Sequence, residues 1–289
     1  MKTFTKVSLI ICGVFLVLGV VLVSIGSAMG LPDQFLKKAA REDLFNVWED
    51  QEITAGERGS VSEKPAAEAG QISEIPAVDD YEYSKTITDN VRELEIDIAY
   101  GAVRIVTHAG EDIYVLAENT GKYFKCWVEE QELHLEDKRK STLENLDLAV
   151  YIPETKLQEL SVDLGAGYLE AGTLQVGECS LDVGAGECVI ERLEVSGEAE
   201  LSVGAGRIQV DAFVGNHLEG NCGAGELEVG LQGSFANYNY EIDAAIGEIL
   251  LGEQSYGGLA NDKSINNGAV GRIELDCAVG SIKIHFTDN

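Results

Sequence analysis

Histidine, tryptophan and proline are scarce in this chain. Its 289 residues include four histidines, two tryptophans and four prolines. So few imidazole and indole groups leave little material for a metal cluster or an aromatic binding platform. The C-x-x-C pair, the phosphate-binding G-x-x-x-x-G-K-[ST] loop and the G-x-S-x-G nucleophile elbow are also absent from the sequence. We therefore expect no catalytic residues, no cofactor and no enzymatic activity.

Basic residues are outnumbered by acidic ones. Lysine and arginine total 21 against 50 aspartates and glutamates, which gives a formal net charge of −29. A field this negative repels nucleic acid and anionic lipid surfaces, so we expect no nucleic-acid partner. The hydrophobic share of 45% is large enough for a buried core, and 32 glycines suit many tight turns between strands.

A long uncharged run lies near the N-terminus. Residues 7–32 carry no charge, and as a helix at ~1.5 Å per residue they reach about 39 Å, more than the ~30 Å hydrocarbon core of a bilayer. Lys2 and Lys6 precede the run, which favours a cytoplasmic N-terminus. The sequence predicts that residues 1–31 form a single-pass anchor in the cell membrane and that the remainder is extracytoplasmic. A signal peptide cleaved near Ala28 is the alternative.

Residues 32–80 are predicted to connect this anchor to a folded domain. Residues 33–50 place apolar side chains among charged ones at roughly helical spacing, which is typical of a juxtamembrane helix. Residues 51–80 lack periodicity and are rich in Glu, Ala, Gly and Ser, which predicts a disordered acidic linker. The folded domain is therefore expected to begin near Tyr81.

A repeat is the strongest pattern in the chain. Small-residue turns begin at Ala99, Gly165, Gly184, Gly204, Gly223, Ala245 and Ala278. When each turn is numbered from its first residue as zero, positions −5, −3, −1, +4 and +6 are apolar throughout, and Gly220 is the single exception. Positions −4 and −2 are polar in every copy. This alternation predicts strands with one buried face and one solvated face.

Units of this size cannot bury a face alone, so they must stack. The four central turns follow one another at intervals of 19, 20 and 19 residues. We therefore predict an all-β fold, a β-solenoid resembling a parallel β-helix with six coils, preceded by the transmembrane helix. An antiparallel sandwich or roll built from the same units is the alternative.

Residues 106–158 interrupt the repeat. Four further strands are expected there, over residues 113–118, 123–129, 132–136 and 146–152. We expect this block to cover the first coil, so that residues 81–158 and 159–289 form two parts of one domain. Nothing in the sequence caps the other end, and the exposed edge expected at residues 281–286 predicts a monomer or a weak end-to-end oligomer formed by strand addition.

Three segments of the chain resemble a known family. They are the anchor ending in SIGSAMG, the opening unit LEIDIAYGAVRI, and tandem units such as LSVDLGAGYLE and LSVGAGRIQV. Together they resemble the bacterial "putative adhesin" family. The resemblance implies a β-helical, extracytoplasmic domain without established catalytic residues, often found beside envelope-stress regulators. We therefore expect a cell-envelope protein that binds protein or glycan partners, with an accessory role in an envelope-stress system as the alternative.

The cysteines occupy apolar positions of the repeat. Cys179, Cys188, Cys222 and Cys277 stand where other copies have Leu, Val or Ile, so we expect buried, reduced thiols. A disulfide is the alternative if stacking brings Cys179 close to Cys188 or Cys222.

Outward-facing aspartates recur at position −2. Asp163, Asp182, Asp243 and Asp276 belong to this set. The simplest interpretation is a charged solubility face that discourages sheet pairing, with no metal bound. The sharper alternative is weak Ca²⁺ binding by these four aspartates, because oxygen ligands in a row suit that ion. A third alternative is a polysaccharide-acting enzyme in which Asp163 and Asp182 form an acid/base pair.

Overall fold

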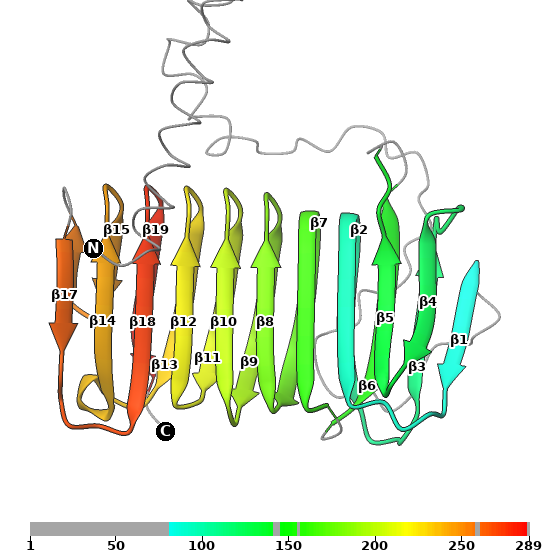
Figure 1. Cartoon of the computed structure of the whole chain (residues 1–289), viewed down its shortest axis with the longest axis horizontal. Helices are drawn as coiled ribbons and strands as arrows, with labels where there is room; N and C mark the ends of the chain where they lie inside the picture. Colours follow the sequence, from blue (N-terminus) through cyan, green and yellow to red (C-terminus); the bar gives the residue numbers. More distant parts are fainter. Residues whose placement is uncertain (1–80, 141–144, 155–156, 258–260, 288–289) are drawn as a thin grey trace, which may run out of the picture. The chain divides into compact units, whose positions relative to one another are not determined.

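The computed structural model describes residues 81–140, 145–154, 157–257 and 261–287 (Figure 1). The predicted anchor at residues 1–31 and the linker at residues 32–80 lie outside the described residues. Among those that are described, no helix combines the length and apolar character needed to cross a membrane. The helical element of this part is one 3₁₀ turn, Phe235–Asn237.

The described chain is all-β, as predicted, and its strands form one continuous hydrogen-bonded sheet. Each of the four strands expected between residues 106 and 158 is present, with bounds that shift by at most one residue. The strands are β1 (Tyr83–Ile87), β2 (Glu93–His108), β3 (Ile113–Glu118), β4 (Phe124–Glu129), β5 (Glu132–Asp137), β6 (Leu146–Pro153), β7 (Glu159–Val176), β8 (Glu178–Val183), β9 (Glu187–Val195), β10 (Glu198–Val203), β11 (Arg207–Val214), β12 (His217–Cys222), β13 (Glu226–Gln232), β14 (Tyr238–Ala244), β15 (Glu248–Leu251), β16 (Gln254–Gly257), β17 (Asn261–Ile265), β18 (Gly271–Cys277) and β19 (Ser281–Thr287).

Each repeat unit contributes to two rows of parallel strands. The first row contains β8, β10 and β12, and the second contains β9, β11 and β13. The long strands β2 and β7 run through the turn and supply both rows at once. Equivalent repeat positions face one another, as Asp163 faces Asp182 between β7 and β8. This parallel pairing of successive units rules out the antiparallel alternative for the repeats.

The last unit does not lie at the end of the stack. Strands β18 and β19 insert between the β12–β13 unit and the β14–β15 unit, as the front row of Figure 1 shows. Strand β19 therefore has a parallel neighbour on each side, β13 and β15. The prediction of an open edge at residues 281–286, with end-to-end strand addition there, was wrong. The β14–β15 unit stands at this end, and antiparallel β17 and β16 pair with it.

The opposite end is built in the same way. Strands β5 and β6 form a further unit that pairs in parallel with β2, although it follows β2 in sequence. Antiparallel β4 then covers β5, and β3 and β1 cover β6. The expectation that this block covers the first coil is confirmed. The described residues thus contain eight units, counting from β5–β6 to β14–β15, where the sequence predicted six.

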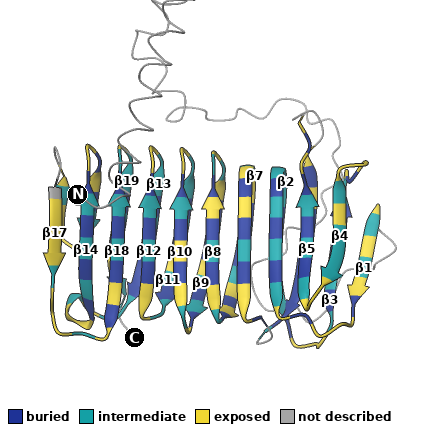
Figure 2. Cartoon of the chain, viewed as in Figure 1, coloured by how far each residue is buried: buried dark blue, intermediate teal, exposed yellow. Residues whose placement is uncertain are grey.

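The alternate apolar side chains share one core. Every apolar repeat position is buried, and the same is true of Gly220. The larger side chains among them belong to a single hydrophobic cluster that extends through all eight units. Figure 2 shows the resulting alternation of buried and exposed residues along each strand. Hydrophobic burial of this kind is the main favourable term in folding.

The small turns form a tightly stacked corner. A Cβ atom on Gly206 would lie 2.0 Å from the carbonyl oxygen of Gly186, and one on Gly186 would lie 2.5 Å from that of Gly167. The backbone amide of Ala205 donates to the Gly184 carbonyl of the preceding unit at 2.7 Å. Glycine is therefore required here by the close approach of neighbouring backbones rather than by a special backbone angle.

Candidate functional site

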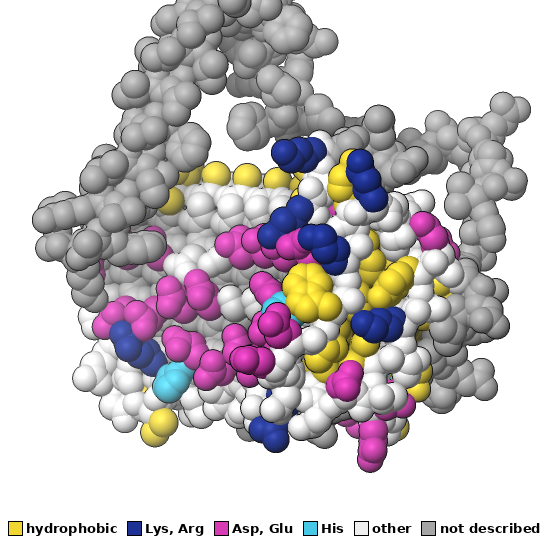
Figure 3. All heavy atoms as spheres, turned by 45° about the vertical axis from the view of Figure 1, so that its right-hand side comes forward, with side chains coloured by type: hydrophobic (Ala, Val, Ile, Leu, Met, Phe, Trp, Pro, Cys, Tyr) yellow, Lys and Arg dark blue, Asp and Glu magenta, His cyan; other side chains and the backbone are white. Residues whose placement is uncertain are grey.

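Four glutamates lie side by side on the outer face of the first row. Glu132, Glu93, Glu159 and Glu178 are the first residues of β5, β2, β7 and β8, and they are in register from strand to strand. We call these four residues the glutamate row. Burial raises the pKa of Glu159, and the neighbouring charges of Glu93, Glu178 and Glu132 raise it further. Figure 3 shows carboxylate side chains gathered over this side of the molecule.

The four aspartates predicted as calcium candidates lie on the same face as two separate pairs. Asp163 faces Asp182, and Asp276 faces Asp243. Ser202 and Asn221 stand between the two pairs. The structure therefore does not bring the four together into one cluster.

In each pair, the pKa of one aspartate is raised. Burial raises the pKa of Asp163, and the charges of Asp97 and Asp182 add to this effect. The pKa of Asp276 is likewise raised by burial and then by Asp243. A nearby cation would favour the ionised form of these carboxyl groups and so lower the pKa of both Asp163 and Asp276.

Toward the β5 end of this face, lysines form ion pairs with the carboxylates of Asp97 and Glu136. The Lys138 ammonium lies 2.8 Å from a carboxylate oxygen of Asp97 and 3.2 Å from one of Glu136. These hydrogen bonds, first the one to Asp97, raise the pKa of Lys138. Lys125 also binds Glu136, at 2.5 Å. Unlike Asp97, the side chains of the glutamate row at β2, β7 and β8 have no ion pair or hydrogen bond with another described side chain.

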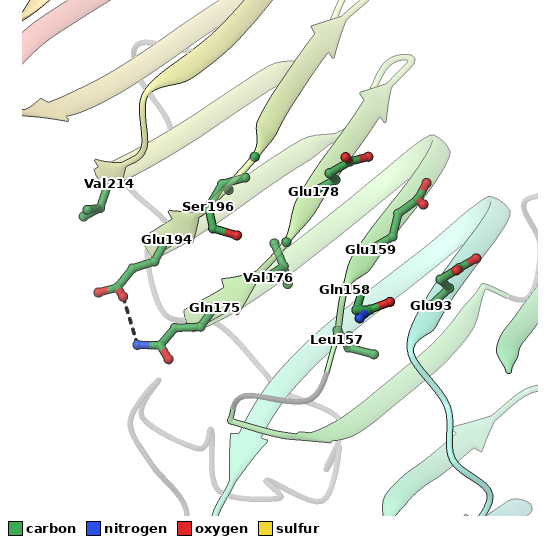
Figure 4. Close-up of a pocket in the computed structure, with 13 residues that line it drawn as sticks. Glu93, Leu157, Gln158, Glu159, Gln175, Val176, Glu178, Glu194, Ser196 and Val214 are labelled. Atoms are coloured by element: carbon green, nitrogen blue, oxygen red, sulfur yellow. Dashed lines mark hydrogen bonds between the residues drawn. The ribbon is translucent and has the colours of Figure 1, made fainter. Parts of the chain in front are cut away.

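A shallow open groove of about 860 Å³ runs beside the glutamate row. It follows the second corner of the stack, where the chain passes from the end of one unit to the start of the next (Figure 4). Its apolar lining includes Leu157, Val176 and Val195, and the carboxylates of Glu93, Glu159 and Glu178 stand in a line along its rim. The groove is therefore of mixed polarity, with nearly buried apolar side chains at its base and carboxylates on one side.

The other side of the groove is largely neutralised. Gln175 donates a hydrogen bond to Glu194 at 2.9 Å, and Arg192 donates to the same carboxylate at 2.6 Å. A second hollow of about 710 Å³ shares Val195 and Val214 with the first and continues it past Tyr238. Together the two hollows extend along this corner toward the β14 end of the stack.

The cysteines have no disulfide among the described residues, and Cys179, Cys188, Cys222 and Cys277 are buried free thiols, as expected. Cys126, for which no expectation was made, is a half-buried free thiol. Burial raises the pKa of Cys179 to about 12. The neighbouring strands align Cys222 with Cys277, a pair that the sequence did not suggest, because β18 lies out of order.

The groove and the glutamate row were missed in the sequence. A signal for the row was present, since several units carry Glu one residue before position −5. The groove depends on the shape of the second corner, for which the repeat pattern gives no information.

Comparison with known proteins finds structural likenesses. No family model matches the chain, and no curated protein is significantly similar to it. A crystal structure of a putative cell adhesion protein from Clostridium sporogenes is similar, with 19% identity, a TM-score of 0.42, and coverage of 71% of this chain and 99% of that one. Crystal structures of putative adhesins from Parabacteroides distasonis and Parabacteroides merdae match with identities of 13% and 11% and TM-scores of 0.31 and 0.33. Both matches cover 70% of this chain, with 96% and 95% of the other chain.

The names of these structures agree with the family that the opening and tandem units resemble. At such identities and TM-scores they carry no argument about the ligand of this chain. The argument about function therefore comes from the geometry of the groove.

Proposed function

We propose that this chain is a membrane-anchored, adhesin-like binding protein that holds an extended, positively charged partner along the acidic groove. We infer that its eight units form a β-solenoid whose rigid stacking keeps the groove in a fixed shape. The observation that carries the proposal is the glutamate row, whose four carboxylates stand in register and of which three, Glu93, Glu159 and Glu178, line the groove's rim.

The charges of the row favour a cationic partner. Neighbouring strands lie ~4.8 Å apart, and two unit charges at that distance in water repel by about 0.9 kcal/mol. The raised pKa of Glu159 is consistent with this repulsion. A Lys- or Arg-rich segment in extended conformation supplies repeated positive charges and removes the repulsion. Such a segment of an envelope protein is the partner that the groove's chemistry fits.

Binding rather than catalysis is proposed because the carboxylates recur along the stack. A general acid/base pair needs two groups whose environments give them different pKa values. The candidate pair does not stand out in this way, because Asp163 and Asp182 occupy equivalent positions of a repeated series that also includes Asp97. A row of equivalent groups is suited to multivalent attachment.

The location of the protein is part of the proposal. Residues 7–32 are proposed to span the cell membrane, with residues 32–80 connecting them to the extracytoplasmic domain. The full chain is then expected in the membrane fraction, resistant to alkaline carbonate, with the folded domain accessible to external protease in spheroplasts. Release of the whole chain by carbonate would contradict the anchor.

The groove is tested by binding of fluorescent decalysine to the full chain in detergent. The variant Glu93→Gln/Glu159→Gln/Glu178→Gln removes three charges from the row and is expected to weaken binding at least tenfold and to reduce its salt dependence. Fully acetylated decalysine is expected not to bind.

A matched control removes three exposed carboxylates elsewhere, as Asp147→Asn/Asp211→Asn/Glu253→Gln. It is expected to retain affinity within about twofold, since screened distant charges contribute little. An equal loss in both triple variants would show that the net charge, rather than the groove, attracts decalysine. Binding of a neutral glycan array component that competes with decalysine would instead identify a glycan as the partner.

A further inference from the structure

A histidine and two glutamates meet at the β5 end of the same face. His134 on β5 faces Glu95 on β2, and Glu132 lies two residues before His134 on the same side of β5. The His134 Nδ1 atom is 2.5 Å from a Glu95 carboxylate oxygen, and Nε2 is 3.6 Å from one of Glu132. One ligand atom from each residue lies within 4.8 Å of the other two.

The imidazole of His134 is held in place by an aromatic neighbour. Trp127 on β4 is in register with His134, and their rings stack with centroids 4.8 Å apart and planes at 11°. The His134 side chain is 16% exposed, whereas that of Glu95 is 46% exposed. The stack therefore fixes the ring and leaves its two nitrogens near the partly exposed carboxylates of Glu95 and Glu132.

We propose that His134, Glu95 and Glu132 form a binding site for a divalent transition-metal ion of the Zn²⁺ class. One imidazole nitrogen and two carboxylate oxygens are the mixed N/O ligands that such ions take, and water completes the coordination. The two carboxylates neutralise the ion's charge. Ca²⁺ is disfavoured because it prefers ~6–8 oxygen ligands and no nitrogen.

The distances allow the ion to enter with small movements. Zn²⁺ bonds of ~2.0–2.2 Å to nitrogen and oxygen place tetrahedral ligand atoms about 3.4 Å apart. The present separation of 2.5 Å between Nδ1 and Glu95 is that of a hydrogen bond, whereas the 3.6 Å to Glu132 is measured from the other ring nitrogen, Nε2. An ion bound at one nitrogen therefore needs the carboxylate at the other edge of the ring to turn toward it, and one ligand atom of each residue already lies within 4.8 Å of the others. Because Glu95 is half-exposed, a rotation of its carboxylate opens the first distance.

This site is separate from the proposed binding of a cationic segment, although Glu132 belongs to the glutamate row. A bound ion would neutralise the β5 end of the row and leave Glu93, Glu159 and Glu178 charged. The test below measures the metal alone, so its outcome does not depend on the proposed partner.

The test uses the full chain with Trp48→Phe, which leaves Trp127 as the single indole. ZnCl₂ alone is titrated by calorimetry and by Trp127 emission in a buffer without chelating components. We expect one ion per chain, a change in Trp127 emission that saturates at the same stoichiometry, and reversal by EDTA. An excess of CaCl₂ is expected not to compete.

Two histidine variants in the same background form a matched pair. His134→Gln is expected to lower the affinity at least tenfold and abolish the emission change. His217→Gln, at an exposed histidine of the same face on β12, is expected to change neither. Glu95→Gln, which leaves the Trp127–His134 stack in place, provides a second loss-of-ligand variant if His134→Gln fails to fold. Equal affinities in the His134→Gln and His217→Gln chains, absence of Zn²⁺ binding, or binding without a Trp127 response would overturn the proposal.

Discussion

At the scale of single residues, the glycines of the first corner let neighbouring units approach more closely than any side chain there would permit. The backbone carbonyl of one corner occupies the space where the next glycine would carry a Cβ, as between Gly186 and Gly206. The turns were recognised in the sequence because these small residues recur in register with the apolar pattern.

Gly206→Ala is expected to destabilise the domain by about 1–3 kcal/mol, as overpacking does when backbones must shift. Its Cβ would lie 2.0 Å from the Gly186 carbonyl oxygen. Chemical denaturation of the full chain measures the change in the free energy of unfolding. Gly257→Ala is the control, because its added Cβ would have no neighbour closer than 3.6 Å. Equal stability of the two variants would refute the close-packed corner.

The outward carboxylate of Asp163 has the opposite effect on stability from a salt-bridged acid. Because the pKa of Asp163 is raised in the folded state, the native protein takes up this proton at a higher pH than the unfolded chain does. The ionised group therefore lowers stability at neutral pH, and this cost disappears as the pH falls through the folded-state pKa.

Asp163→Asn is accordingly expected to raise the free energy of unfolding at pH 7 by less than about 1 kcal/mol at low salt. The gain should vanish near pH 3, where the wild-type carboxyl is also neutral. Denaturant titrations between pH 3 and pH 8 measure it. Asp211→Asn, at an acid that accepts a hydrogen bond from Gln209, serves as the comparison. A gain for Asp163→Asn that grows toward acid pH would be incompatible with this account.

At the scale of elements, different side chains cover the hydrophobic core at its two ends. At the β5–β6 end, Asp137 takes an inward position opposite Ile98 and is fully buried. Arg139 binds it through Nε at 2.9 Å and through a terminal nitrogen at 2.6 Å, and also donates to the Asn119 carbonyl at 2.8 Å. At the β14–β15 end, Phe235 stacks on Tyr240 with centroids 4.8 Å apart.

Asp137→Ala is expected to destabilise the fold by about 3–5 kcal/mol, because it removes the carboxylate that the buried Arg139 guanidinium binds through two of its nitrogens. Lys138→Ala removes an exposed lysine next in sequence and is expected to cost no more than about 1 kcal/mol. Thermal and denaturant unfolding compare the two. If the Asp137 variant were as stable as the Lys138 variant, the buried Asp137–Arg139 ion pair would not stabilise this end of the core.

The strands and their buried faces could be predicted from the sequence because period-two alternation is a local property. The order of the units could not, since every unit presents the same apolar face and fits any other. Residues 252–270 are long enough to bring β18 back between β12 and β14, and nothing in their composition specifies that return. The aspartates of the candidate site were found for the same local reason. His134 could not be predicted as a site residue, because its partner, Glu95, is brought to it only by the pairing between β2 and β5.

At the scale of the whole described domain, the two ends are alike in design. Each has a unit placed out of sequence order and then antiparallel strands, β4, β3 and β1 at one end and β17 and β16 at the other. Such covering protects the hydrogen-bonding edges of the stack against pairing with other chains.

The order of the units is tested most directly by two pairs of engineered cysteines on the outer face. Glu219, Glu274 and Glu241 stand at equivalent positions of β12, β18 and β14, with Glu274 in the middle. Oxidation with copper phenanthroline, followed by peptide mass spectrometry, is expected to link Glu219→Cys to Glu274→Cys rapidly. The pair Glu219→Cys and Glu241→Cys is separated by two strand spacings, ~9.6 Å, beyond the ~7 Å limit for a disulfide, and should remain reduced. Rapid linkage of the second pair and none of the first would mean that the units stack in sequence order, which contradicts the fold described here.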